Sequence, residues 1–230
     1  MKTRVPLSMA LALFATPFVV AQSLPDGDFD ALPVGLAPDC NEPAGAWQFP
    51  PAYIDAALCE VLPTDYQIVP TSSVVPGAGG NSLRMQPGPA TLNSHLPGLF
   101  DTTILESDPL VVVEFEILVP SAEQSGGAIY VGGDHGGGGF ANGTDRGPQM
   151  AWTAGGPVIV ATAAGGAVPV LDAYPVGEWQ SVRLEIDLAA DSWDLLMGFG
   201  EPPQPIAEGL QFRAGTLDFL GTGANAVAFV

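Results

Sequence analysis

The residues best suited to chemistry are two acids in the stretch RLEIDLAADSWDLL, residues 183–196. Glu185 and Asp187 are two positions apart, so in a β-strand their side chains leave the same face. A retaining glycosidase needs two such carboxyl groups about 5–5.5 Å apart, one as nucleophile and one as acid/base. We therefore consider Glu185 and Asp187, together with His135, as the candidate catalytic group of a glycan hydrolase or lyase.

The same stretch is also typical of a surface hairpin. Arg183 falls on the face of Glu185 and would hold that carboxylate ionised, which suits a salt bridge as well as an active site. The turn would lie around residues 189–192. We favour this hairpin, whose polar face leaves Arg183 and Glu185 available for binding a ligand. The inward face would carry Val182, Leu184 and Ile186.

A glycine-rich stretch, residues 130–147, places Asp134 beside His135. The two neighbours could bind a metal or exchange a proton, but a surface loop at the mouth of a binding site is the preferred interpretation. In either case His135 is a candidate ligand-binding residue. The stretch is not a phosphate-binding loop, because it lacks the Lys-Ser/Thr ending.

Aromatic residues provide the second candidate binding group. Trp152, in QMAWTAGG, is our preferred exposed platform for stacking on a sugar ring, with Tyr130 beside it if their strands pair. Packing in the core is the more frequent fate of such a tryptophan.

The stretch DGDFD contains a candidate cation site. Asp26, Asp28 and Asp30 alternate, so in a strand they would project from one side, and hard oxygen ligands suit Ca²⁺. An acidic edge strand that resists edge-to-edge pairing is the simpler alternative. No other cofactor is expected.

Residues 1–21 are typical of a secretory signal peptide: Lys2 and Arg4 precede a short apolar stretch and a small-residue cleavage pattern. We expect residues 22–230 to form one domain that is secreted, extracellular or periplasmic, and not inserted in a membrane. In that oxidising environment Cys40 and Cys59 would form a disulfide.

The chain is strongly acidic, with a formal net charge of −19. Such a charge repels nucleic acid and anionic membranes, so we expect neither as a partner. It suits a divalent cation, a neutral sugar or a cationic partner, or simply keeps an exported protein soluble. Outside the predicted leader the basic residues are Arg84, Arg146, Arg183 and Arg213.

The elements that must position these residues are short strands. The 29 glycines and 23 prolines punctuate runs rich in Val, Ile, Leu and Phe, and only residues 51–60 suggest a short helix. This pattern predicts an all-β fold with very little helix, a double-sheet antiparallel β-sandwich of the jelly-roll kind. The clearest strand spans residues 109–120; others are expected at 65–70, 81–86, 126–133, 149–154, 157–164, 167–174, 183–196 (with its turn), 210–215, 216–221 and 225–230, the last resembling a strand cut short at its end.

Three stretches in order resemble the concanavalin A-like lectin/glucanase superfamily, including laminin-G-like modules of secreted bacterial proteins. They are DGDFDALPVGLAPDC…AWQ, NSLRMQPG and YPVGEWQSVRLEIDLAADSWDLLMG. The resemblance implies a jelly roll and a carbohydrate ligand, a polysaccharide or cell-surface glycan. It also implies core positions for Trp179 and Trp193. Laminarinase-type members carry a Glu-x-Asp-x-(x)-Glu pattern, whose first two acids match Glu185 and Asp187. The third would fall at Ala189 or Ala190, and Asp191 comes one step too late.

These observations predict a secreted, non-catalytic recognition or surface-structural module that binds carbohydrate. One alternative is a glucanase-like hydrolase or lyase that uses Glu185 and Asp187. Another is a purely structural or adhesive domain of a larger exported protein.

Overall fold

The computed structural model describes residues 29–30, 32, 34–35, 66–85, 96–100, 110–121, 127–132, 146–163, 165–213 and 225–229. Within these ranges the only helical element is the short 3-10 helix Thr71–Ser73. The strands are β1 (Tyr66–Pro70), β2 (Asn81–Met85), β3 (Leu96–Phe100), β4 (Leu110–Leu118), β5 (Gly127–Gly132), β6 (Arg146–Trp152), β7 (Val158–Ala161), β8 (Ala167–Leu171), β9 (Trp179–Asp187), β10 (Ser192–Gly198), β11 (Gln204–Gln211) and β12 (Asn225–Phe229).

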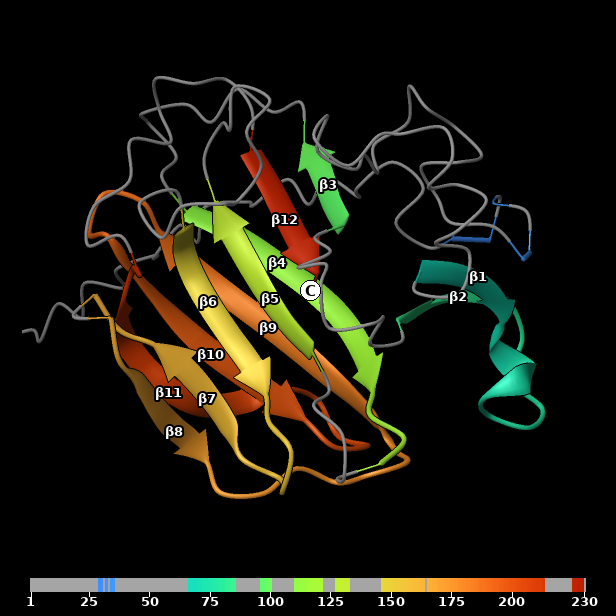
Figure 1. Ribbon diagram of the computed structural model, residues 1–230. Coiled ribbons are helices and arrows are strands. Elements are labelled where there is room, and N and C mark those ends of the chain that lie inside the picture. Colours follow the sequence, from blue (N-terminus) through green and yellow to red (C-terminus); the bar gives the residue numbers. More distant parts are fainter. Residues whose placement is uncertain are drawn as a thin grey trace, which may run out of the picture.

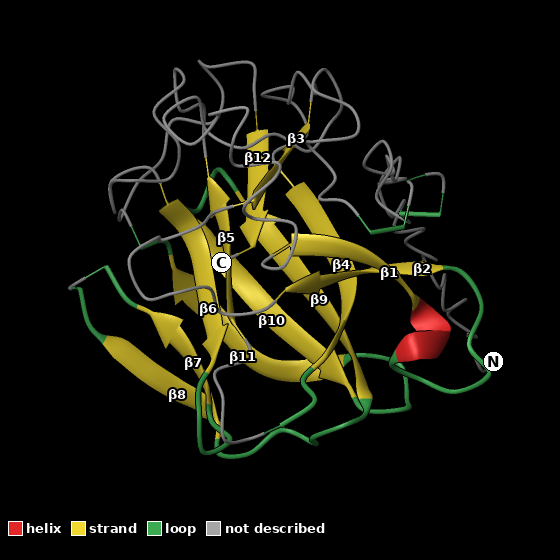
Figure 2. Cartoon of the chain, turned by 45° about the vertical axis from the view of Figure 1, so that its right-hand side comes forward, coloured by secondary structure: helices red, strands yellow, loops and turns green. Residues whose placement is uncertain are grey.

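Two antiparallel sheets pack face to face, as Figure 1 shows. One has four strands in the order β11-β10-β9-β4, and the other has six in the order β3-β12-β5-β6-β7-β8. A separate ribbon, β1-β2, lies beside them with the 3-10 turn that follows β1 (Figure 2). The predicted all-β antiparallel sandwich with very little helix is confirmed. The short helix expected at residues 51–60 lies outside the described residues.

The core lies between the two sheets and is built from alternate residues of each strand. In β9 burial alternates at every position, with Val182, Leu184 and Ile186 at most 1 % exposed. In β4 the partners Val113 and Phe115 sit opposite Leu184 and Val182 and pack against the same cluster. The predicted inward face of β9 is therefore confirmed, and β4 packs against it with the same alternation. Their opposite faces, by the period of two, point away from the core.

One buried polar contact crosses between the sheets. Trp152 of β6 donates its indole N–H to Gln180 Oε1 of β9 at 2.9 Å, and Gln180 is fully buried. The Gln180 amide in turn donates to the carbonyl of Pro175 at 3.0 Å. Phe115 contacts Trp152 edge-to-face, with ring centroids 6.2 Å apart. A buried amide is tolerated here because both of its ends are hydrogen-bonded.

Two of the stretches that carried the family resemblance contact each other in the fold. Asp30 Oδ1 accepts the backbone N–H of Asn81 at 2.7 Å, and the Asn81 side chain donates to carbonyls of Phe29, Asp30 and Leu32. Phe29 and Asp30, the described residues of DGDFD, are therefore hydrogen-bonded to the first residue of β2.

Candidate functional site

The outward-pointing residues of β4, β9 and β10 form a single surface, which we call the outer face. Strand register arranges it in rows across the sheet. In order, the rows are Leu118–Trp179, Glu116–Ser181–Gly198, Glu114–Arg183–Leu196, Val112–Glu185–Asp194 and Leu110–Asp187–Ser192.

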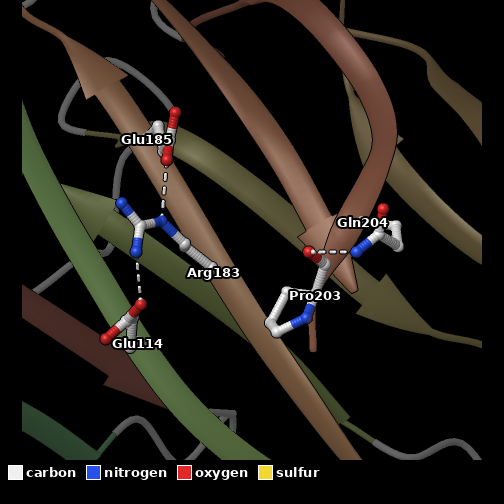
Figure 3. Close-up of polar contacts among 5 residues, drawn as sticks. All are labelled: Glu114, Arg183, Glu185, Pro203 and Gln204. Carbon is white, nitrogen blue, oxygen red and sulfur yellow. Dashed lines mark hydrogen bonds and ion pairs between the residues drawn. The ribbon is translucent and has the colours of Figure 1, made fainter. Parts of the chain in front are cut away.

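Arg183 is at the centre of the outer face and joins two carboxylates (Figure 3). Its Nη1 lies 2.7 Å from Glu114 Oε1, and its Nε lies 2.7 Å from Glu185 Oε1. Partial burial lowers the pKa of the guanidinium, but hydrogen bonds to Glu185 and Glu114 outweigh it and raise that pKa above its ordinary value. All three side chains are more than a third exposed, so these ion pairs fix side-chain positions and add little stability.

The other acids of this face bind backbone amides. Asp187 Oδ1 accepts the N–H groups of Ala189 at 2.9 Å and Ala190 at 3.0 Å, which closes the β9–β10 turn. Asp194 Oδ1 accepts the N–H of Gly209 at 2.7 Å, beside an irregular part of the β10–β11 pairing. Asp187 therefore fixes the turn that follows β9, and Asp194 fixes the contact between β10 and β11.

The catalytic hypothesis finds little support in this geometry. Glu185 is engaged by Arg183, and Asp187 caps a turn, so the two acids have separate structural partners. Asp191 lies in the turn itself with a left-handed φ of 50°, off the strand face. A glycosidase needs a carboxyl group placed to protonate the leaving group, and here Glu185 and Asp187 accept hydrogen bonds from Arg183 and from the turn amides instead.

Trp179 is the aromatic residue that the outer face provides. It is half-buried, is opposite Leu118, and alternates with the fully buried Gln180. It is absent from the core cluster and from the side chains packed against it. The expectation that Trp179 belongs to the core is corrected: the alternation that turns Ser181 and Arg183 outward also turns Trp179 outward. That alternation was the signal in the sequence that could have identified it.

The aromatic residues expected to be exposed are not. Trp152 is 1 % exposed and lies in the core, because its indole N–H finds a partner in Gln180 inside the sandwich. Tyr130 is 8 % exposed and points to the other side of the six-stranded sheet, opposite Gln149. The expectation of a stacking platform at these two residues is therefore corrected. Trp193, at 1 % exposure, is in the core as expected.

The predicted ligand-binding residues are consequently not brought to one site. Arg183 and Glu185 share the outer face, whereas Trp152 and Tyr130 lie in and beyond the opposite sheet. His135 lies outside the described residues.

The predicted strand of alternating acids is wrong at its C-terminal end. Phe29 has a left-handed φ of 57°, so the backbone turns there, and Asp30 is bound to Asn81. Asp26 and Asp28 lie outside the described residues. Within the described ranges no three Asp, Glu, His or Cys side chains are grouped so that they could hold a metal ion.

Cys40, Cys59 and the predicted leader also lie outside the described residues. No helix in the described part of the chain is long and apolar enough to span a membrane.

Comparison with known proteins identifies no family. No protein-family model matches the chain, and no curated protein matches it in sequence. Among solved structures, a chain described as a sialidase is similar over 72 % of this chain, with 10 % identity and a TM-score of 0.47. This protein spans 13 % of the length of that sialidase chain. The all-β antiparallel architecture that the sequence resemblance implies is present in the structure.

Proposed function

We propose that this protein is a non-catalytic recognition module of the concanavalin A-like superfamily and that it binds carbohydrate on the outer face. The observation that supports this most is the position of Trp179 on the same surface as the Arg183–Glu114–Glu185 network. An aromatic ring can stack on the apolar face of a sugar, while polar groups held nearby bond its hydroxyls.

The Arg183 network suits recognition because it is already ordered. Two carboxylates hold the guanidinium plane, so little side-chain freedom remains to be lost when a ligand binds. The Oε2 atoms of Glu114 and Glu185 remain available as acceptors, because each ion pair uses Oε1. Ser181, the outward residue that precedes Arg183 on β9, adds a hydroxyl.

One edge of this surface is walled by backbone. Gly198, opposite Ser181, lies against the chain at residues 201–203, and a Cβ there would be 2.1 Å from the carbonyl oxygen of Glu201. The row Glu116–Ser181–Gly198 therefore ends at the β10–β11 loop. A ligand over Trp179 and Ser181 would be bounded on that side.

A glycan array followed by calorimetry tests the proposal. Trp179→Ala should weaken any glycan binding at least about tenfold, which corresponds to about 1.4 kcal/mol. Val168→Ala, which trims a 48 % exposed residue of the other sheet, should leave affinity unchanged. Binding that survives Trp179→Ala would exclude the outer face as the site. Silence of the wild type across neutral, acidic and amine-bearing glycans would overturn carbohydrate binding and favour a structural or adhesive domain.

The proposal includes export of the module. Residues 1–21 would be removed, and Cys40 and Cys59 would be joined, which would stabilise the fold by roughly 3 kcal/mol in the chain-entropy model. The mature N-terminus and the mass before and after reduction test both points. A mature protein that retains Met1, or that carries two free thiols, would contradict them.

A further inference from the structure

The outer face carries an excess of negative charge. Its rows contain one basic residue, Arg183, and five carboxylates. The backbone contacts of two of these acids satisfy hydrogen bonds but leave their charge in place. The five are Glu114, Glu116, Glu185, Asp187 and Asp194.

Glu116 is the carboxylate of this group that is least engaged. It is exposed, and the Ser181 hydroxyl lies 3.5 Å from its Oε1, at the limit of a hydrogen bond. Glu114 and Glu185, by contrast, each lie 2.7 Å from a nitrogen of Arg183. Glu116 therefore has the most capacity to pair with a cation from solution.

A second observation, independent of charge, places an aromatic ring beside Glu116. Glu116 pairs with Ser181, and Trp179 is two residues before Ser181, so Glu116 and Trp179 are diagonal neighbours. Diagonal neighbours on adjacent antiparallel strands lie about 7–8 Å apart, within reach of aromatic and long side chains. Trp179 is half-buried and turned away from the core, so this arrangement is part of the exposed sheet face.

We propose that the ligand of the outer face is an amine-bearing glycan in its protonated form. This inference rests on the proposed carbohydrate binding and adds the chemical class of the sugar. The sugar ring would stack on Trp179, and its ammonium group would bond Glu116 and gain from the indole face. An anionic glycan would be repelled by the surplus carboxylates, and a neutral one would leave their charge uncompensated.

The charge of the whole chain supports the same choice. With a net charge of −19, the protein has a long-range field that attracts cations, and few basic residues are present to reverse it. The field would bring the ligand to the surface, while Glu116 and Trp179 would select its chemistry.

The test compares two probes with the same sugar backbone, a β-1,4-linked glucosamine oligomer and its fully N-acetylated counterpart, in which an acetyl group removes the positive charge of each amine. The wild type should bind the amine form at least about tenfold more tightly. This advantage should shrink between about 0.1 M and 1 M salt, as the Debye length falls from about 10 Å to about 3 Å. Glu116→Gln should reduce the preference for the amine form and spare binding of the acetylated form. Asp172→Asn removes an exposed acid beyond β8 of the other sheet and should change neither.

Each other outcome contradicts a specific part of the argument. Equal binding of both probes, lost in Trp179→Ala, would overturn the amine preference and leave the proposed function intact. Binding of neither probe, with silence across the array, would overturn both. A preference for the amine form that survives Glu116→Gln and Trp179→Ala, or that falls equally in Asp172→Asn, would indicate attraction to the acidic chain as a whole and overturn the site.

Discussion

Replacing Gln180 with leucine should destabilise the sandwich strongly, although the two side chains have similar size. The change removes the acceptor of the Trp152 N–H, which lies in the core, and the donor to the half-buried Pro175 carbonyl. A buried polar group left unpaired costs about 1–3 kcal/mol, and the carbonyl, nearer to solvent, should cost less. We expect the free energy of unfolding to fall by about 2–4 kcal/mol, which at this chain length lowers Tm by roughly 5–15 °C.

Urea unfolding followed by tryptophan fluorescence and circular dichroism measures this loss. Gln204→Leu is the matched control, because its side-chain amide donates to Pro202 and Pro203 in an exposed loop, and it should cost less than about 0.5 kcal/mol. In the double variant with Trp152→Phe, no indole N–H remains to be satisfied, so the combined loss should be smaller than the sum. A Gln180→Leu variant as stable as the control, or strictly additive losses, would refute a role for this contact.

Two further predictions concern a turn and a buried tyrosine. Asp187→Ala should cost about 1 kcal/mol in urea unfolding, because two turn amides lose their acceptor, whereas Asp187→Asn keeps an acceptor oxygen and should cost less than half as much; equal losses would contradict the capping role. Burial raises the pKa of Tyr174, whose hydroxyl donates to the Thr153 carbonyl at 3.0 Å. Its stabilising contribution should therefore be complete below the unfolded value of about 10 and be lost as pH rises through the higher folded pKa. Tyr174→Phe should flatten that alkaline decline in unfolding free energy, and an unchanged decline would count against the assignment.

The sequence predicted the fold well wherever a strand has one buried face. In β9 the alternation of apolar and polar residues placed Val182, Leu184 and Ile186 inward and Arg183 outward, as observed. The strands expected at residues 157–164 and 167–174 pair as β7 and β8, with Gly165 and Gly166 between them. Such features depend on neighbours in sequence, and a strand's period of two expresses them directly.

The candidate site was harder to predict because its contacts are distant in sequence. Arg183 meets Glu114 across 69 residues, and Trp152 meets Gln180 across 28. Without the strand register, Trp152 beside glycine-rich turns looked exposed. Trp179 was misplaced for the opposite reason: a resemblance to a packing motif was given more weight than the alternation of its own strand.

The strict alternation of β9 also has an evolutionary consequence. Inward residues such as Leu184 fix stability, since truncating a buried leucine costs about 2–5 kcal/mol, whereas changes at outward positions usually stay within about 0.5 kcal/mol. Trp179, Ser181 and Arg183 can thus be exchanged while the sandwich persists. In this nine-residue strand, substitutions on the outward face can change which ligand is bound, while the inward face preserves the fold.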